Sequence, residues 1–416
     1  VLRGPASVVD GDGAIGGVVN VIPRKPRHGA IRHEVRAGIG NRGQRSLDFD
    51  SSGSISERLA YRLDASAERG DGWVDRGKHS SQGLSGALQW QFLPRWQLQL
   101  SHAEGRHKPM RYFGVPLIDG KPLDALRRTN YNVHDARITF LDHWSELTLQ
   151  GSPSDNVAVR SRLYHIRSNR LWFDAENYTW DAARQQIRLA GDTAIRHHQK
   201  QTGNTTDVTF DGKLLGMDNT ISAGFDLNHS SLQHDNNTYS GNPRYVSLLS
   251  PETGFFDSDL PFIPRYRNTA DQYALFVEDR LAVTGQLSLV AGLRHDRVRI
   301  RRDDLITGSR AFSRTWNSTG HRLGAVYALT PTLSVYAQHS RAADPSTAPL
   351  MMSASGAKAD MTIGRQIEVG IKQSLPQQRG EWTLAAYHIT KHNLQSRDPA
   401  NPDNSIQVGK QSSRGI

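Results

Sequence analysis

Strict alternation of apolar and polar side chains is the feature that most constrains the fold of this chain. In an extended strand, successive side chains point to opposite faces. The segment 59–68 places one set on each face: Leu59, Tyr61, Leu63, Ala65 and Ala67 oppose Ala60, Arg62, Asp64, Ser66 and Glu68. The segments 31–39, 96–101 and 333–338 repeat this pattern. Because no segment shows a helical period with caps, the sequence predicts an all-β chain with little helix.

The connections between these segments alternate in length. Short turns are indicated at 53–57, 92–95, 152–156, 284–286, 329–332 and 375–381. Long connections, rich in Gly, Pro, Asp, Asn and aromatic residues, are indicated near 69–81, 104–135, 168–190, 230–270, 301–315, 342–363 and 392–405. Outer-membrane barrels have short periplasmic turns and long extracellular loops, whereas a soluble β-sandwich has no reason to sort its loops in this way.

The number of predicted strands limits which barrel sizes are possible. From residue 30 onward, the alternation predicts about 15 strands and the start of a sixteenth. Barrels of roughly 22 strands with a plugged lumen are a known size class, and an open sheet edge has no hydrogen-bond partners in lipid. The chain begins at Val1 without a signal peptide and stops at Ile416 within a predicted strand. Both ends are therefore expected to be truncated, and this chain alone is not expected to close a barrel.

Composition excludes several other classes. The chain has no run of about 18 apolar residues, so it is not a helical membrane protein. It has no cysteine, which removes disulfide scaffolds and thiolate metal sites. The net charge is +10, but the basic residues are scattered and form no block, so nucleic acid is not an expected partner. A basic lumen would favour anionic ligands.

Two short motifs that resemble nucleotide sites fail on their context. Gly11, Gly13 and Gly16 satisfy G-x-G-x-x-G, but the β-branched segment VVNVIPRKP follows where a helix is required. The segment 72–79 approximates a phosphate loop, with His in place of the Ser or Thr that binds magnesium. The 17 histidines include one adjacent pair, at 197–198, and their spacing indicates exposed residues and no metal cluster. The sequence predicts no enzyme, no resident cofactor and no metal.

The first residues, VLRGPASVVDGDGAIGGVVNVIPRKP, resemble the end of the plug domain of TonB-dependent siderophore receptors. The positions that match that family's pattern are Arg3, Gly4, Pro5, Gly11, Gly16, Gly17, Asn20, Lys25 and Pro26, while Asp10 stands where the family commonly has Tyr. The resemblance continues, in the family's order, through SERLAYRLDASAERGDGWVDRG, DQYALFVEDRLAVTGQLSLVAGLRHD, AVYALTPTLSVYAQHS, QIEVGIKQSLPQQRGEWTLAAYHITKHNL and QVGKQSSRGI. It covers nearly the whole chain.

This resemblance implies a domain organisation and a function. Residues 1–29 would be the C-terminal end of a plug domain, and residues 30–416 a transmembrane antiparallel β-barrel that is incomplete at its C-terminus. The protein would be a monomer in the outer membrane of a Gram-negative cell, surrounded by its lipid. It would import a ferric siderophore into the periplasm, driven by the TonB complex through a region absent from this chain.

Several alternatives remain open at this point. A receptor for haem, copper or a vitamin in the same superfamily is the nearest, although the text YAQHSRAADPS lacks the FRAP-like motif that is usual in haem receptors. A non-functional receptor fragment and a soluble β-rich binding protein are the others. The sequence does not specify which siderophore is carried.

Aromatic and arginine residues in the predicted long loops are the candidate ligand mouth. They are Arg111, Tyr112, Phe113, Trp172, Tyr178, Tyr239 and Tyr245, with Phe173, Tyr266, Arg170, Arg244 and Arg265 close by. Rings combined with guanidinium groups suit an anionic, partly aromatic chelate. Packing among loops, or an interfacial aromatic girdle, would use the same residue types.

Plug packing is assigned from the resemblance to Arg3, Gly4, Pro5, Gly16, Gly17 and Asn20. The candidate partners of Arg3 on the lumen wall are Glu34, Asp64, Glu68, Glu278 and Asp279. Ion pairs of this kind would hold the plug and still allow it to move.

Overall fold

The computed structural model describes residues 2–3, 8, 17–18, 21–238, 243–344, 349–375, 380–397 and 405–416. The strands are β1 (Leu2–Arg3), β2 (Gly17–Val18), β3 (Arg32–Ile39), β4 (Arg45–Ser56), β5 (Leu59–Gly70), β6 (His79–Leu93), β7 (Trp96–Lys108), β8 (Arg137–Ser154), β9 (Val157–Asp181), β10 (Gln186–Leu214), β11 (Met217–Asn236), β12 (Arg244–Val246), β13 (Ile263–Ala282), β14 (Leu287–Asp304), β15 (Arg310–Ala328), β16 (Leu333–Asp344), β17 (Thr362–Ser374), β18 (Glu381–Arg397) and β19 (Ser405–Gly415). The named helices of this described chain are the short 3₁₀ turns η1 (Asp124–Leu126), η2 (Pro349–Met351) and η3 (Gly356–Lys358). Among the described residues, no helix has the length and apolar character to cross a membrane. The prediction of an all-β chain with little helix is confirmed.

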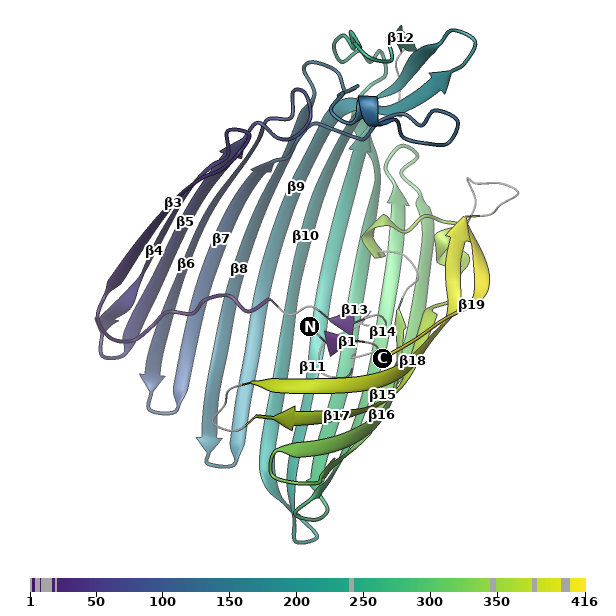
Figure 1. The fold of residues 1–416 in the computed structure, drawn as a ribbon. Coiled ribbons are helices and arrows are strands. Elements are labelled where there is room, and N and C mark those ends of the chain that lie inside the picture. Colours follow the sequence, from purple (N-terminus) through teal and green to yellow (C-terminus); the bar gives the residue numbers. More distant parts are fainter. Residues whose placement is uncertain are drawn as a thin grey trace.

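The strands from β3 to β19 form one antiparallel sheet whose order is that of a barrel wall (Figure 1). Within the described residues sixteen long strands contribute, each paired with the next long strand along the chain. The short β12 instead adds to the upper part of β10. Among the registers of the described residues, none joins β19 to β3, and these strands lie at separate edges in Figure 1. The sheet is open, in agreement with the expectation that this chain does not close a barrel alone.

The two ends of the sheet differ in their connections. At one end, strands are joined by turns at 57–58, 94–95, 155–156, 215–216, 283–286 and 329–332. At the other end, which is uppermost in Figure 1, the connections within the described residues include 40–44, 71–78, 109–136, 182–185, 243–262, 305–309 and 349–361. The longest of these all lie at the upper end, but 40–44, 182–185 and 305–309 at that end are nearly as short as the turns, so the predicted sorting by length holds only in part.

Two predicted long connections are wrong. Residues 301–315 lie mostly in β14 and β15, which leaves 305–309 between the strands. Residues 168–190, expected to form a long loop, extend two strands instead, because β9 runs to Asp181 and β10 begins at Gln186. Their pairing continues beyond the end of β8 as a hairpin that rises above the wall. Aromatic and β-branched residues favour strands, and this segment contains both. Richness in Asp and Asn therefore did not distinguish a loop from a projecting hairpin.

The two faces of the wall carry different side chains. On β14, burial alternates residue by residue from Leu289 to Ile300. The inner face is identified by the segment 21–30, which runs along the concave side of the sheet in Figure 1. Within it, the backbone amides of Arg27 and Gly29 donate to hydroxyl groups on β4. The strand registers carry this assignment from β4 around the sheet.

The outer face holds an apolar band. Its members on successive strands include Leu63, Leu84, Leu100, Leu147, Leu163, Leu227, Leu275, Leu293, Leu323 and Leu384. Their exposed fractions lie between 37 and 69%. So much exposed apolar area is unfavourable in water and is typical of the lipid-facing wall of an outer-membrane barrel.

Histidine recurs at the upper margin of this band. In six strands of the described sheet, an outward Leu or Ala is followed two residues later by His: His102 on β7, His165 on β9, His229 on β11, His295 on β14, His339 on β16 and His388 on β18. These strands all run in the same direction, because each is separated from the next by one antiparallel long strand. Outer-membrane barrels commonly carry aromatic rings at this interface. The histidines mark the level at which the outer face changes from apolar to polar.

The acidic residues predicted to bind Arg3 have other surroundings. Glu34 lies 2.7 Å from Arg36, Asp64 lies 2.7 Å from Arg62, Glu68 accepts from Gln44 at 3.2 Å, and Glu278 lies 3.7 Å from Arg322. Asp279 follows the inward Glu278 and pairs with the outward Ile221, so its prediction as a lumen residue is wrong. Val8 is buried on the inner face, where a Cβ on Gly292 would lie 3.0 Å from it and 3.1 Å from Glu278. The side chain of Arg3 lies outside the described residues.

Candidate ligand-binding site

A folded cap, formed by residues 109–136, 174–194 and 243–262, lies at the upper end of the sheet (Figure 1). Its apolar core consists of buried Tyr131, Ile187, Leu189 and Val246. The Tyr131 ring lies 5.7 Å from the ring of Tyr178, and its hydroxyl donates to the carbonyl of Leu248. Burial raises the pKa of Tyr131 to about 12, so this hydroxyl stays a neutral donor. The long loops are therefore packed together instead of extending freely into solvent.

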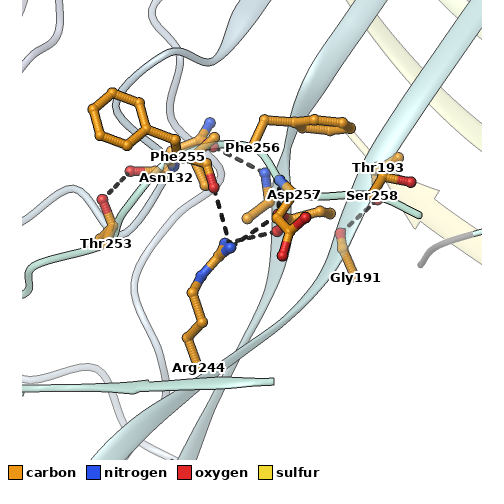
Figure 2. Close-up of polar contacts among 12 residues, drawn as sticks. Asn132, Gly191, Thr193, Arg244, Thr253, Phe255, Phe256, Asp257 and Ser258 are labelled. Carbon is orange, nitrogen blue, oxygen red and sulfur yellow. Dashed lines mark hydrogen bonds and ion pairs between the residues drawn. The ribbon is translucent and has the colours of Figure 1, made fainter. Parts of the chain in front are cut away.

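Asn132 joins the three parts of the cap. Its side-chain Oδ1 accepts hydrogen bonds from the backbone amides of Val133 and Ala175, at 2.9 and 3.0 Å. Its backbone carbonyl accepts from the Thr253 hydroxyl at 2.7 Å, as Figure 2 shows, and from the Arg76 guanidinium at 2.9 Å. Asn132 is 1% exposed. A buried amide with these partners fixes loop positions that apolar packing alone would leave adjustable.

A buried ion pair holds β12 on the projecting hairpin. The Arg244 guanidinium donates to both carboxylate oxygens of Asp192, at 2.8 and 3.0 Å. The same guanidinium donates to the Phe255 carbonyl at 3.1 Å, and the Asp257 amide donates to Asp192 at 2.6 Å (Figure 2). The Asp192 side chain is 3% exposed. Bidentate pairing with extra hydrogen bonds is the arrangement that makes a buried carboxylate tolerable.

Asp174 lies in the same hairpin, above the part of β9 that pairs with β8. Its side chain is fully buried, and neither carboxylate oxygen has a hydrogen-bond partner in the described chain. Burial, with smaller effects from Glu176 and Asp192, raises the pKa of Asp174 to about 8. The carboxyl group is therefore mostly protonated at neutral pH, which avoids a buried charge beside Asp192.

Below the cap, five rings form a continuous row on the inner face, which we name the aromatic belt: Phe140, Trp172, His197, His234 and Tyr266. Each comes from a different strand, β8, β9, β10, β11 and β13 in turn. The distances between successive ring centroids are 5.3, 5.2, 5.0 and 4.7 Å. The belt thus presents a row of aromatic groups near the upper end of the wall.

An arginine lies over each end of the aromatic belt. The guanidinium of Arg170 lies 4.8 Å from the centre of the Phe140 ring, and that of Arg302 lies 3.5 Å from the centre of the Tyr266 ring. His197 Nε2 and His234 Nδ1 are 2.8 Å apart at the middle. Rings of this kind stack on planar aromatic groups, and guanidinium groups pair with anionic oxygens. The belt is chemically suited to an anionic ligand with aromatic parts.

The predicted mouth residues lie in two different regions of the structure, the aromatic belt and the cap. Trp172 belongs to the aromatic belt, as do the neighbouring predicted residues Arg170 and Tyr266. Tyr178 is packed in the cap, where its hydroxyl donates to the Ala175 carbonyl at 2.6 Å. These residues lie near one end of the wall but form no single cluster.

The remaining predicted mouth residues lie around the cap. Arg111 donates to the Ala136 carbonyl at 3.1 Å, and the Tyr112 ring packs edge-on against Trp73 at 5.1 Å. Phe113 and Tyr245 are 40% and 38% exposed. Tyr239 lies outside the described residues. Contact of any of these side chains with a ligand stays a prediction.

Sequence reasoning missed Phe140 and His234, and it interpreted His197 as an exposed residue. His197 is partly buried within the aromatic belt, so that interpretation is wrong for this member of the histidine pair. The only sequence signal was the pair itself. The belt joins five strands, and its members become neighbours only through the strand registers.

Part of the predicted plug packing can be located. Arg3 on β1 pairs with Gly17 on β2 in a separate two-stranded sheet. The other predicted plug residues, Gly4, Pro5, Gly16 and Asn20, lie outside the described residues. Their role in plug packing stays a prediction.

A family model described as "TonB dependent receptor-like, beta-barrel" matches residues 104–416. Among curated proteins, the chain is 25% identical over 449 residues to the metal-pseudopaline receptor CntO of Pseudomonas aeruginosa, covering 100% of this chain and 60% of that protein. It is 25% identical over 439 residues to the ferrioxamine B receptor of Salmonella typhimurium, covering 100% of this chain and 59% of that protein. The chain thus spans about 60% of the length of these curated relatives.

Solved structures share the fold. The siderophore receptor PiuA from Acinetobacter baumannii superposes with a TM-score of 0.87 at 16% identity, covering 99% of this chain and 64% of that one. The ferric-catecholate import receptor Fiu from Escherichia coli K12 gives a TM-score of 0.86 at 17% identity, covering 100% of this chain and 65% of that one. At these identities the likeness concerns the fold alone.

Proposed function

Because the chain belongs to the TonB-dependent receptor family, we propose that the full-length protein imports a ferric siderophore across the Gram-negative outer membrane. Members of this family are outer-membrane receptors, and the apolar outer band of the sheet agrees with that location. The aromatic belt is the observation that supports a siderophore as ligand. The relatives named above include receptors for ferrioxamine B and for metal-pseudopaline.

The chemistry of the aromatic belt suits the proposed ligand class. Many iron chelators present planar aromatic groups and carry negative charge as ferric complexes. Trp172 and Tyr266 supply aromatic rings to the row, and Arg170 and Arg302 lie at its two ends, Arg170 also 3.2 Å from Asp142. Stacking with rings contributes about 0.5–1.5 kcal/mol per contact beyond the area that it buries. The charge at the ends would favour anionic complexes over neutral ones.

The transport step is proposed for the whole protein. Residues 1–29 would be the end of a plug, residues 30–416 most of a barrel wall of roughly 22 strands, and TonB would act through a region outside this chain. The buried Val8 beside Gly292 agrees with an N-terminal segment lodged against the inner wall. A monomer is sufficient for this function, since the lumen of one barrel holds the whole pathway.

Uptake measurements test this proposal. A deletion strain carrying the full-length gene is starved of iron and supplied with a panel of purified siderophores loaded with radioactive iron, with matched chelates of zinc and nickel alongside. Uptake of at least one ferric siderophore should depend on the gene and should fall about tenfold in the Trp172→Ala, Tyr266→Ala double variant at equal protein level. If no iron chelate depends on the gene, the siderophore assignment fails. Uptake of a zinc or nickel chelate alone, or of haem or a vitamin, would reassign the substrate.

A further inference from the structure

Two histidines and a glutamate converge on the outer face of the sheet, away from the lumen. They are His102 and Glu104 on β7 and His143 on β8. Their ligand atoms all lie within 4.8 Å of one another. The register places Glu104 directly opposite His143. The group lies immediately above the outward Leu100, at the upper margin of the apolar band, where water can reach it.

The distances from each histidine to Glu104 match those between neighbouring ligands around a tetrahedral metal ion, and the two histidine nitrogens lie within 4.8 Å of each other. His102 Nε2 and His143 Nδ1 lie 3.3 and 3.2 Å from the same carboxylate oxygen, Glu104 Oε1. Metal bonds of about 2.0–2.2 Å at tetrahedral angles place neighbouring ligand atoms about 3.3–3.5 Å apart. Three protein ligands with a fourth position open to water are the usual set for an accessible zinc ion.

A hydroxyl group orients the first histidine. His102 Nδ1 lies 2.8 Å from the Ser145 hydroxyl on the neighbouring strand. When Nδ1 donates its proton to this hydroxyl, the lone pair of Nε2 faces the Glu104 oxygen. Either a proton or a metal ion can then lie between these two atoms, and the hydroxyl orients the ring for both. A hydrogen bond from the non-ligating nitrogen is a common feature of metal-bound histidines.

The surroundings select the class of metal. Arg167 lies opposite His143 on β9, and Arg106 follows Glu104 on the same face of β7. Their positive charge opposes any bound cation, so an ion must be held by direct bonds to the three ligands. Mg²⁺ and Ca²⁺ prefer all-oxygen sites. Two imidazole nitrogens with one carboxylate suit zinc, nickel or copper instead.

From this geometry we propose that His102, Glu104 and His143 form a divalent transition-metal site on the outer surface of the wall, at the level where lipid tails give way to the headgroup region. The site is separate from the aromatic belt, which lies on the inner face. This proposal concerns metal binding at the upper margin of the outer apolar band, and it does not depend on which ligand the receptor transports.

His165 provides a matched control. It occupies the same place on β9, two residues after the outward Leu163, and its Nδ1 lies 2.7 Å from the Thr202 hydroxyl. His102 has the same pattern relative to Leu100 and Ser145. In the described part of the chain, His165 belongs to no group of three or more His, Cys, Asp or Glu residues that could hold a metal ion. It therefore shares the environment of the proposed site without its ligand set.

The experiment uses the full-length receptor in detergent, stripped of metal and titrated with Zn²⁺ against a chromogenic chelator, with Mg²⁺ as the negative probe. Carbethoxylation of histidines, read by mass spectrometry, locates the bound ion. We expect zinc to protect His102 and His143 but not His165. Affinity should fall at least tenfold in Glu104→Gln and in His143→Ala, and stay unchanged in His165→Ala.

Folding of each variant is checked by the heat-dependent migration of the barrel on gels, so that loss of binding is not confused with loss of structure. Equal zinc affinity in the wild type and in folded Glu104→Gln and His143→Ala would overturn the proposal. Protection of His165 to the same extent as His102, or no zinc binding by the wild type at micromolar concentration, would also overturn it.

Discussion

The wall and the cap are stabilised in different ways. In the wall, each strand from β3 to β19 is hydrogen-bonded to its neighbours in the sheet. Successive side chains along a strand alternate between the two faces, which decides the face of each residue. In the cap, a few buried polar groups such as Asn132 and Asp192 connect segments that are far apart in sequence. The wall should therefore tolerate changes that respect the face of a residue, whereas the cap should respond strongly to the loss of one polar partner.

The largest expected effect is on the cap. Arg244→Ala would leave the Asp192 carboxylate buried without its bidentate partner, and removing one member of a buried pair typically costs about 3–5 kcal/mol. Because Arg244 itself is 26% exposed at the side chain, the lower figure is expected. Hydrogen exchange of the amides in 174–194 and 243–262 should show cap opening that is easier by about 3 kcal/mol, with the wall amides unchanged.

Arg184→Ala is the matched control for this change. Arg184 pairs with Asp181 at the tip of the same hairpin at 2.9 Å, but its side chain is 57% exposed. Exposed pairs contribute about 0–1 kcal/mol. Arg184 also lies 4.6 Å from the centre of the Tyr245 ring on β12, so a small loosening is expected in this variant too. Equal loosening by both variants would mean that burial of the Asp192 pair is not what holds β12 in place.

The next largest effect tests the wall. Leu100→Arg would put a charge on the apolar outer band, which costs about 2–4 kcal/mol at the membrane midplane and less near the interface. Leu100 precedes the margin marked by His102, so about 2 kcal/mol is expected. Ser101→Arg places the same charge one residue later on the inner face and should change the free energy of unfolding little. Denaturant unfolding of the full-length protein in lipid vesicles measures both, and equal losses would contradict the assignment of faces.

The wall could be predicted from the sequence because its signal is local. In the segment from Leu59 to Glu68, the alternation of apolar and polar residues alone shows which side chains share a face, and β5 spans this segment. Register and face follow from the same period. The projecting hairpin was missed because its aromatic and β-branched residues, which favour strands, stand among the Asp and Asn residues that are typical of loops. Residues 174–181 pair with β10.

The cap and the aromatic belt could not be predicted in this way. The Thr253 hydroxyl donates to Asn132, 121 residues earlier, and Arg244 reaches back 52 residues to Asp192. His234 meets His197 only because two strands pair in one particular register. Such contacts depend on three-dimensional positions that no local pattern encodes. The metal site proposed at His102 and His143 could not be predicted from the sequence for the same reason.

An effect of pH with a defined sign concerns the same cap, and its size is given per pH unit. Burial raises the pKa of Asp174 from its ordinary value of 3.8 to about 8. Between these values the folded cap holds one more proton than the open cap, so the opening free energy falls as pH rises through this window and is level above it. The slope cannot exceed about 1.4 kcal/mol per pH unit.

Asp174→Asn removes this titration while keeping a neutral side chain of similar size. Hydrogen exchange of 174–194, corrected for the intrinsic pH dependence of amide exchange, should show a flat opening free energy in the variant and a falling one in the wild type. A wild-type profile that is already flat between pH 5 and 8 would mean that the carboxyl group stays ionised when buried.

The smallest expected effect is on ligand affinity, and it distinguishes the aromatic belt from the cap, the two regions in which the predicted mouth residues lie. Trp172→Ala removes a central ring of the aromatic belt, and loss of one stacking contact is worth about 1 kcal/mol, or roughly a fivefold to tenfold weaker Kd for the transported chelate. Tyr245→Ala removes a partly exposed ring of the cap that packs under Arg184 at 4.6 Å. Titration of the full-length receptor with the chelate found by the uptake panel should weaken for the first variant and stay within twofold for the second. If Tyr245→Ala weakens binding more than Trp172→Ala, the ligand binds on the cap. The aromatic belt would then stabilise the wall, and Arg170 and Arg302 would pack over its end rings without contacting the ligand.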